Sequence, residues 1–110
     1  MHELGISRNV VAIVGEAARG RRVRRVTLEI GRLSGVLPEA LGFAFPIAAH
    51  GTPAEEAELE IRLVDGRARC GDCGAEFGVP DFFAACACGS RRLAHIAGEE
   101  LNVKSIDLED

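Results

Sequence analysis

Four cysteines in two close pairs, Cys70-x-x-Cys73 and Cys86-x-Cys88, are the side chains of this sequence best suited to chemistry. Zn(II) in structural sites takes four tetrahedral ligands, and thiolates suit it well. Two cysteines separated by two residues can reach one ion from a single tight turn. Gly74 follows the first pair, at a position where such a turn often needs a positive φ. The pattern therefore predicts a structural zinc site on Cys70, Cys73, Cys86 and Cys88.

The second cysteine pair is less regular than the first. Only one residue separates Cys86 from Cys88, so the turn must be distorted if both sulfurs bind one ion. A site of three cysteines completed by His50, His95 or water is one alternative. A redox-active dithiol or a set of free thiols is another. For each histidine taken singly, a surface or packing role is favoured over metal ligation.

The amino-terminal residues Met1-His2-Glu3 offer a second kind of metal site. The terminal amine, the first backbone amides and the His2 imidazole can close fused chelate rings around one ion. Square-planar nitrogen coordination of this kind is typical of Ni(II) and Cu(II). A large residue at position 2 generally blocks removal of Met1, which keeps the amine in place. Taken alone, however, His2 is also compatible with a frayed terminus, and Glu3 with a first-turn helix acid.

Hydrophobic periodicity predicts the elements that must position these residues. Apolar residues at helical spacing predict a helix over residues 4–19, closed by Gly20: Leu4, Val11, Val14 and Ala18, with Val10, Ile13 and Ala17 widening the stripe. A second helix begins at Pro38, and Pro46 should kink or shorten it. Its expected apolar stripe is Leu41, Ala44, Phe45 and Ala48.

Alternating apolar residues predict three strands, around residues 26–30, 59–63 and 101–103. Ile106 and Leu108 are out of phase with Leu101 and Val103, which predicts a bulge or a loose end in the last strand. The order predicts an α+β fold with two helices packed on a small three-stranded sheet and an inserted zinc-ribbon-like domain. Residues 1–66 and 97–110 would form the α/β domain, and residues 67–96 the insert.

Size and composition limit the core of this chain. It has 110 residues, 47% of them apolar, with neither Trp nor Tyr, so a metal cross-link would add considerably to stability. Three aromatic side chains in the insert could cover the cysteines: Phe77, Phe82 and Phe83. The pattern of a signal peptide is missing, and we expect no membrane-spanning segment. With paired cysteines, these features predict a cytoplasmic protein.

Charge is distributed unevenly along the sequence, although the net charge is only −4. Residues 1–32 contain seven Arg against three acidic residues, whereas residues 33–110 contain six basic against fourteen acidic residues. Five of the arginines lie between Arg19 and Arg25. This arginine cluster is interpreted first as a solvated turn, and alternatively as a docking patch for an acidic partner. Overall acidity and the lack of neighbouring aromatics argue against nucleic acid.

No motif in the sequence indicates an enzyme. The serines are not in a recognisable nucleophile motif, and no Gly-rich phosphate-binding loop is present.

The motifs in their order resemble the hydrogenase maturation nickel metallochaperone family (HypA/HybF). The resemblance covers nearly the full length and rests on these segments: the Met1-His2-Glu3 start with its following helix, Val26–Glu39, Leu41–Phe45, Gly51-Thr52, Ala57–Ile61, Cys70–Gly74, Cys88–Ser90 and Gly98–Leu101. The family's fourth zinc cysteine falls at Ala85 or Cys86, depending on a one-residue gap, and Cys86 is the only suitable candidate. Pro46 also departs from the residue usual in the family.

The resemblance implies a function in metal delivery. It implies that Ni(II) is bound as cargo by Met1, His2 and Glu3, and that Zn(II) is bound by Cys70, Cys73, Cys88 and, with the gap placed as above, Cys86. It further implies delivery of nickel to the large subunit of [NiFe]-hydrogenase together with a GTPase nickel-insertion accessory protein. Some members of the family also act with urease maturation proteins. The transfer would be ligand exchange and not catalysis.

Two other functions remain open from the residues alone. A zinc-ribbon adaptor that binds protein or nucleic acid without nickel would depend on the arginine cluster and would show a steep salt dependence. A thiol oxidoreductase would use Cys70 and Cys73 and would need a reactive thiol of low pKa.

Overall fold

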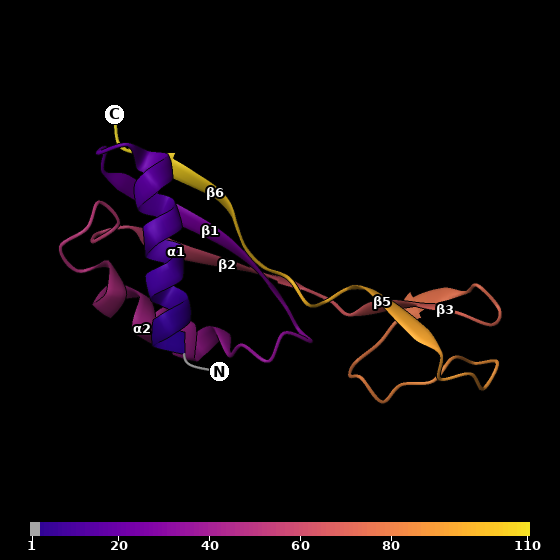
Figure 1. Cartoon of the computed structure of the whole chain (residues 1–110). Coiled ribbons are helices and arrows are strands. Elements are labelled where there is room, and N and C mark those ends of the chain that lie inside the picture. Colours follow the sequence, from indigo (N-terminus) through magenta and orange to yellow (C-terminus); the bar gives the residue numbers. More distant parts are fainter. Residues whose placement is uncertain (1–2) are drawn as a thin grey trace.

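The computed structural model describes residues 3–110, which form two lobes joined end to end (Figure 1). The molecule is elongated, with principal extents of 52 × 25 × 16 Å. The elements in chain order are α1 (Glu3–Ala18), β1 (Val23–Gly31), α2 (Pro38–Ala49), β2 (Glu58–Val64), β3 (Arg67–Cys70), β4 (Glu76–Gly78), β5 (Leu93–Ala97) and β6 (Leu101–Leu108). Among them, no helix is long and apolar enough to cross a membrane.

The first lobe consists of both helices and a three-stranded sheet of order β2-β1-β6. β1 pairs with β2 in parallel and with β6 antiparallel. Two parallel strands can be joined only by a crossover connection, and α2 forms the crossover between β1 and β2. α2 packs beside α1. The predicted α+β fold with two helices on a three-stranded sheet is confirmed. Its core includes Val14, Leu28, Leu41 and Phe45.

The buried face of α1 differs in part from the predicted stripe. Val10, Val11, Val14 and Ala18 are buried as expected, together with Ser7. Ile13 is 54% exposed and Ala17 is also exposed, so both predictions were wrong. The helix ends because the next two residues take left-handed backbone, at φ 50° for Arg19 and φ 83° for Gly20.

Pro46 was predicted to kink or shorten α2; the helix runs through Pro46 to Ala49, so the proline does not shorten it. Pro46 has no N–H to donate to the carbonyl of Gly42. Both residues lie on the exposed side of the helix, where water can satisfy that carbonyl. The innermost position of the last turn is Ala49, which is fully buried, while Ala48 is only partly buried.

The predicted irregularity in the last strand is a bulge in β6. Val103 pairs with Leu28 and Ser105 with Thr27, so Lys104 is the extra residue. This places Val103 and Ile106 against the same core although their spacing is odd. A second register shift lies at Arg24 of β1.

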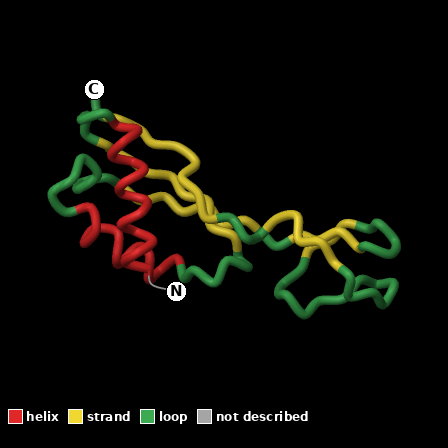
Figure 2. The backbone as a smooth tube through the Cα atoms, in the orientation of Figure 1, coloured by secondary structure: helices red, strands yellow, loops and turns green. Residues whose placement is uncertain are grey.

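The second lobe is a small antiparallel sheet of order β4-β3-β5 with long loops, shown in green in Figure 2. Its buried core is Leu33, Ala68 and Val79, with Phe77, Ala84 and Leu93 packed against it. Leu33 comes from the segment after β1, so the first lobe contributes one side chain to this core. A core of this size provides little stability without a further cross-link.

Candidate metal centre

The four cysteine sulfurs meet at the end of the second lobe, all within 4.8 Å of one another. Sγ of Cys70 lies 3.7 Å from Sγ of Cys88, and Sγ of Cys73 lies 3.5 Å from Sγ of Cys86. All four cysteines are free thiols. With Zn–S bonds of about 2.3 Å, a regular tetrahedron has sulfurs about 3.8 Å apart. The observed separations therefore suit a tetrahedral metal ion at the centre of the cluster.

The first cysteine turn follows directly from the end of β3. The amides of Asp72 and Cys73 both point at Sγ of Cys70, at 3.4 Å. The turn is closed by Gly74, whose N–H donates to the Cys70 carbonyl at 3.0 Å and whose φ is 79°. The positive φ predicted for Gly74 is confirmed, and it is the reason a β-carbon would be strained there.

The second cysteine turn is one residue tighter than the first. The Gly89 N–H donates to the Cys86 carbonyl at 2.8 Å, and the Cys86 N–H donates to the Ser90 carbonyl at 2.9 Å. Gly89 has φ 92°, which reverses the chain directly after Cys88. The short Cys86-x-Cys88 spacing thus forms a closed turn, and both of its sulfurs reach the cluster.

A polar bridge connects the two turns. The carboxylate of Asp72 in the first turn accepts hydrogen bonds from the Ser90 hydroxyl and from Arg92, whose Nη1 lies 3.0 Å from Oδ1. The Ser90 hydroxyl in turn accepts from the Arg92 amide at 3.0 Å, and the Gly71 N–H donates to the Arg92 carbonyl at 2.7 Å. No local sequence pattern predicts this bridge, because its partners are 18 and 20 residues apart.

The crowded sulfurs differ strongly in acidity. Hydrogen bonds from the Cys73 and Asp72 amides lower the pKa of Cys70 from 9.0 to about 6. Although the Ser90 amide favours the Cys88 thiolate, the adjacent Cys86 and Cys70 sulfurs and burial raise the pKa of Cys88 to about 12. The pKa of Cys73 is likewise raised. Without a cation, four thiolates this close cannot all be ionised, and a divalent metal would remove that penalty.

The histidines do not join the cysteine cluster. In the part of the chain that the structure describes, the four cysteines alone form the metal-type group. His95 lies on β5, with its ring 5.0 Å from that of Phe82 in an edge-on arrangement. His50 lies beyond α2, with Nδ1 3.2 Å from Oε1 of Glu55. Phe83 is 81% exposed, so the prediction that it covers the cysteines was wrong.

The predicted nickel residues are described only in part. Met1 and His2 lie outside the described residues, and their prediction stays a prediction. Glu3 begins α1 and is the acidic residue of its first turn. That position agrees with its interpretation as a helix-start acid, which interacts favourably with the helix dipole.

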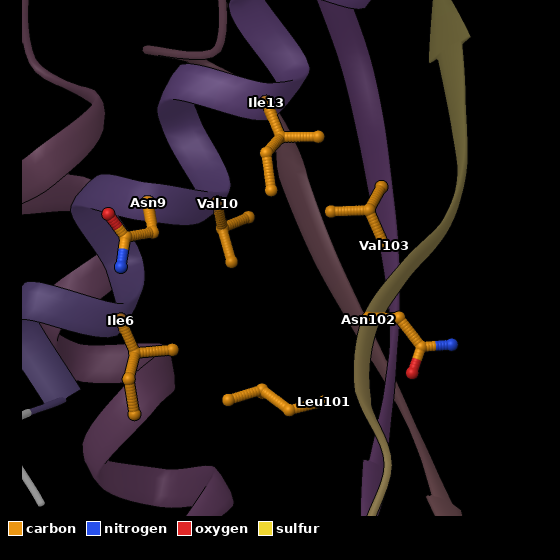
Figure 3. Close-up of a pocket in the computed structure, with 7 residues that line it drawn as sticks. All are labelled: Ile6, Asn9, Val10, Ile13, Leu101, Asn102 and Val103. Carbon is orange, nitrogen blue, oxygen red and sulfur yellow. The ribbon is translucent and has the colours of Figure 1, made fainter.

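A hollow of about 200 Å³ lies between α1 and β6 (Figure 3). Ile6, Val10 and Ile13 face Leu101 and Val103 across it. The Asn102 amide points away and donates to Glu29 at 3.0 Å. Since apolar side chains dominate its lining, this hollow does not have the ligands that a metal ion requires.

Three of the five arginines of the cluster contact other residues of the first lobe. Arg25 lies 3.5 Å from carboxylate oxygens of both Glu58 and Asp107. Arg22 lies 3.1 Å from Glu56, and Arg21 donates to the Glu109 carbonyl at 2.8 Å. These contacts favour the interpretation of the cluster as a solvated turn over its interpretation as a docking patch.

The sequence and fold match known proteins throughout. The family model described as hydrogenase/urease nickel incorporation metallochaperone HypA matches residues 1–108. Hydrogenase maturation factor HypA of a Nostoc species is 51% identical over 110 residues, covering 100% of this chain and 97% of that protein. Its counterpart in Geobacter sulfurreducens is 49% identical over 110 residues, covering 99% and 100%.

A solved structure shares the fold. The solution structure of the Ni metallochaperone HypA from Helicobacter pylori covers 98% of this chain, and this chain covers 97% of it, with a TM-score of 0.73 and 23% identity. Taken with the sequence matches, the chain belongs to the HypA family of nickel-incorporation metallochaperones, which are maturation factors and not enzymes.

Proposed function

We propose that this protein binds Ni(II) as cargo through Met1, His2 and Glu3 and delivers it to the large subunit of [NiFe]-hydrogenase. Cys70, Cys73, Cys86 and Cys88 hold a structural Zn(II). The observation that carries the zinc assignment is the convergence of four sulfurs at distances suited to a tetrahedral ion. The nickel assignment is supported by a family match that begins at residue 1.

The ligands of the two proposed sites favour different metals. A tetrahedral site of four thiolates suits Zn(II), whereas amine, amide and imidazole nitrogens in a plane suit Ni(II). We assign residues 1–66 and 97–110 to the nickel-binding domain and residues 67–96 to the zinc-binding domain. The four reduced thiolates require a reducing compartment, which supports a cytoplasmic location.

Delivery proceeds by ligand exchange. A chelate formed by the terminal residues can bind nickel at neutral pH and release it to a better-ordered site in the acceptor. Protonating the His2 imidazole in mild acid removes one ligand and weakens binding. The partners are a GTPase accessory protein and the hydrogenase large subunit, with urease maturation proteins as a further set of clients.

A Ni(II) titration of untagged, zinc-loaded protein tests both assignments. Wild type and His2→Ala are followed by absorption, with zinc quantified in each. We expect about one zinc per chain in both, and a square-planar nickel signal that His2→Ala abolishes. His50→Ala is the matched control, since it removes an imidazole whose side chain is 85% exposed, and it should bind nickel as wild type does.

The two halves of the proposal fail separately. Equal nickel binding by wild type and His2→Ala would exclude the terminal site and leave a zinc-containing adaptor as the better account. Zinc well below one per chain would exclude the structural zinc assignment and leave the nickel assignment unaffected.

A further inference from the structure

Two sulfur contacts join the cysteine turns to each other. Sγ of Cys73 lies 3.5 Å from Sγ of Cys86. Sγ of Cys70 lies 3.7 Å from Sγ of Cys88. In each contact, one cysteine belongs to the first turn and the other to the second turn. Sulfurs at such separations need only small side-chain rotations to form a disulfide bond.

Each contact pairs an exposed cysteine with a buried one. Cys73 and Cys88 are exposed. Their partners Cys86 and Cys70 are buried, with 6% and 2% of their surface accessible. An oxidant in the solvent therefore reaches Cys73 and Cys88 first, and the buried partner lies directly beside the oxidised sulfur. This is the arrangement of a reactive cysteine next to its resolving cysteine.

The second lobe needs a cross-link between its two cysteine turns. Its small buried core, formed by Leu33, Ala68 and Val79, provides little stability without one. Disulfides between the turns would take over the cross-link that the proposed metal provides, so the lobe would keep its fold. Disulfides within each turn would leave the turns connected by the Asp72 bridge and would not replace the metal.

We propose that the cysteine cluster is a site of reversible oxidation, at which a peroxide converts the four thiolates into two disulfides, Cys73–Cys86 and Cys70–Cys88. This inference rests on the proposed zinc site and adds a second state of the same cysteines. With no thiolate left to hold it, Zn(II) is released. In a reducing compartment, disulfides that form and are reduced again are typically redox-sensing.

The oxidation takes place in two steps at each pair. The exposed thiolate attacks one peroxide oxygen, the O–O bond breaks, and hydroxide leaves and takes up a proton, which gives a sulfenic acid and water. The buried thiolate then attacks the sulfenic sulfur, and a second hydroxide leaves and is protonated. For both pairs together, four thiolates give four electrons to two peroxide molecules, which take up four protons and become four waters.

Treatment of zinc-loaded, untagged protein with hydrogen peroxide tests the proposal. A chromogenic chelator in solution reports released Zn(II), and peptide mapping by mass spectrometry assigns the disulfides. We expect about one Zn(II) released for every two peroxide molecules that the cysteines consume, together with the Cys73–Cys86 and Cys70–Cys88 links. Oxygen added at Met1, the single methionine of the chain, is measured in the amino-terminal peptide and subtracted. A dithiol reductant followed by Zn(II) should restore the starting protein.

NMR amide spectra show whether the disulfides replace the metal as a cross-link. The amide signals of Ala68 and Val79 should stay dispersed in the oxidised protein. In reduced protein from which a chelator has removed the metal, the same signals should lose their dispersion. Loss of dispersion in the oxidised protein would contradict links between the turns.

Two double variants with two cysteines each form a matched pair. Cys70→Ala/Cys88→Ala keeps one contacting pair, an exposed and a buried cysteine. Cys73→Ala/Cys88→Ala keeps only the two buried cysteines. We expect peroxide to form the internal disulfide about tenfold faster in the first variant, because an exposed sulfur is available to the oxidant. The mapping of the wild-type disulfides needs neither variant and decides the pairing by itself.

The zinc site and its oxidation fail separately. Purified protein without zinc would exclude the zinc site, while mapping of the reduced chain after peroxide treatment would still decide the disulfides. Any other pairing, sulfinic acid at the exposed cysteines, or Zn(II) that stays bound in excess peroxide would overturn the proposal.

Discussion

Gly31 and Gly98 lie in direct backbone contact where the two lobes meet, so close that a β-carbon on Gly31 would overlap the carbonyl of Gly98. The contact continues on the other side of Gly98, whose own β-carbon position is 2.6 Å from Cα of Gly66. Hydrogen bonds fix the crossing, since the Leu33 N–H donates to the Gly98 carbonyl and the Gly31 N–H to the Glu100 carbonyl, both at 2.7 Å. The lobes are thus joined by packed main chain and not by a flexible tether.

The substitution Gly31→Ala should destabilise the protein strongly. The added methyl meets backbone that cannot move without breaking the crossing, so we expect a loss of about 3 kcal/mol or more in the free energy of unfolding, measured in denaturant. Gly15→Ala is the control, because nothing lies within 4 Å of that position in α1. It should stabilise by about 0.5–1 kcal/mol. Equal stability of the two variants would contradict the close contact at the junction.

Cys86 should be required for zinc although its spacing from Cys88 is irregular. Cys86→Ser removes one of the four sulfurs, and we expect zinc affinity, measured by chelator competition, to fall more than about hundredfold. Ala87→Ser changes the exposed residue between the two cysteines and should leave the affinity unchanged. Full zinc occupancy in Cys86→Ser would instead favour a site of three cysteines completed by another ligand.

The sequence predicted those features that depend on local pattern or on ligand type. The helices follow from periodicity, the bulge at Lys104 from a change of phase, and the cysteine cluster from spacing and chemistry. Other features depend on contacts between distant residues. Ser7 is fully buried on α1. Its burial is not predicted by hydrophobic periodicity, because serine is polar and only its small size suits the packed face. Leu33 lies outside the helices and strands predicted from the sequence, yet it packs into the core of the second lobe.

The Asp72 bridge between the cysteine turns should contribute to metal affinity. Asp72→Ala removes the acceptor for both Ser90 and Arg92, so the turns lose a contact that holds the sulfurs in place. We expect zinc affinity to fall about tenfold, the lower end of the range for residues around a metal site. Glu99→Ala removes the same charge at an exposed position outside the two turns and serves as the control. If both variants lost affinity equally, the effect would be one of net charge alone.

Zinc affinity should depend on pH in two regimes that meet near pH 6. The raised pKa values of Cys88 and Cys73 mean that zinc must displace their protons at any pH below 8. Cys70, with its pKa lowered to about 6, is already a thiolate between pH 6 and 8 and gives up no proton there. Below pH 6 it is protonated, so one more proton must leave on binding.

The logarithm of the apparent zinc association constant should therefore fall as pH falls throughout. Its slope should steepen by about one log unit per pH unit below pH 6. Competition with a chelator of known proton affinity, measured from pH 8 to pH 5, gives this slope directly. A slope that stays constant through pH 6 would show that the Cys73 and Asp72 amides do not stabilise the Cys70 thiolate in the metal-free protein.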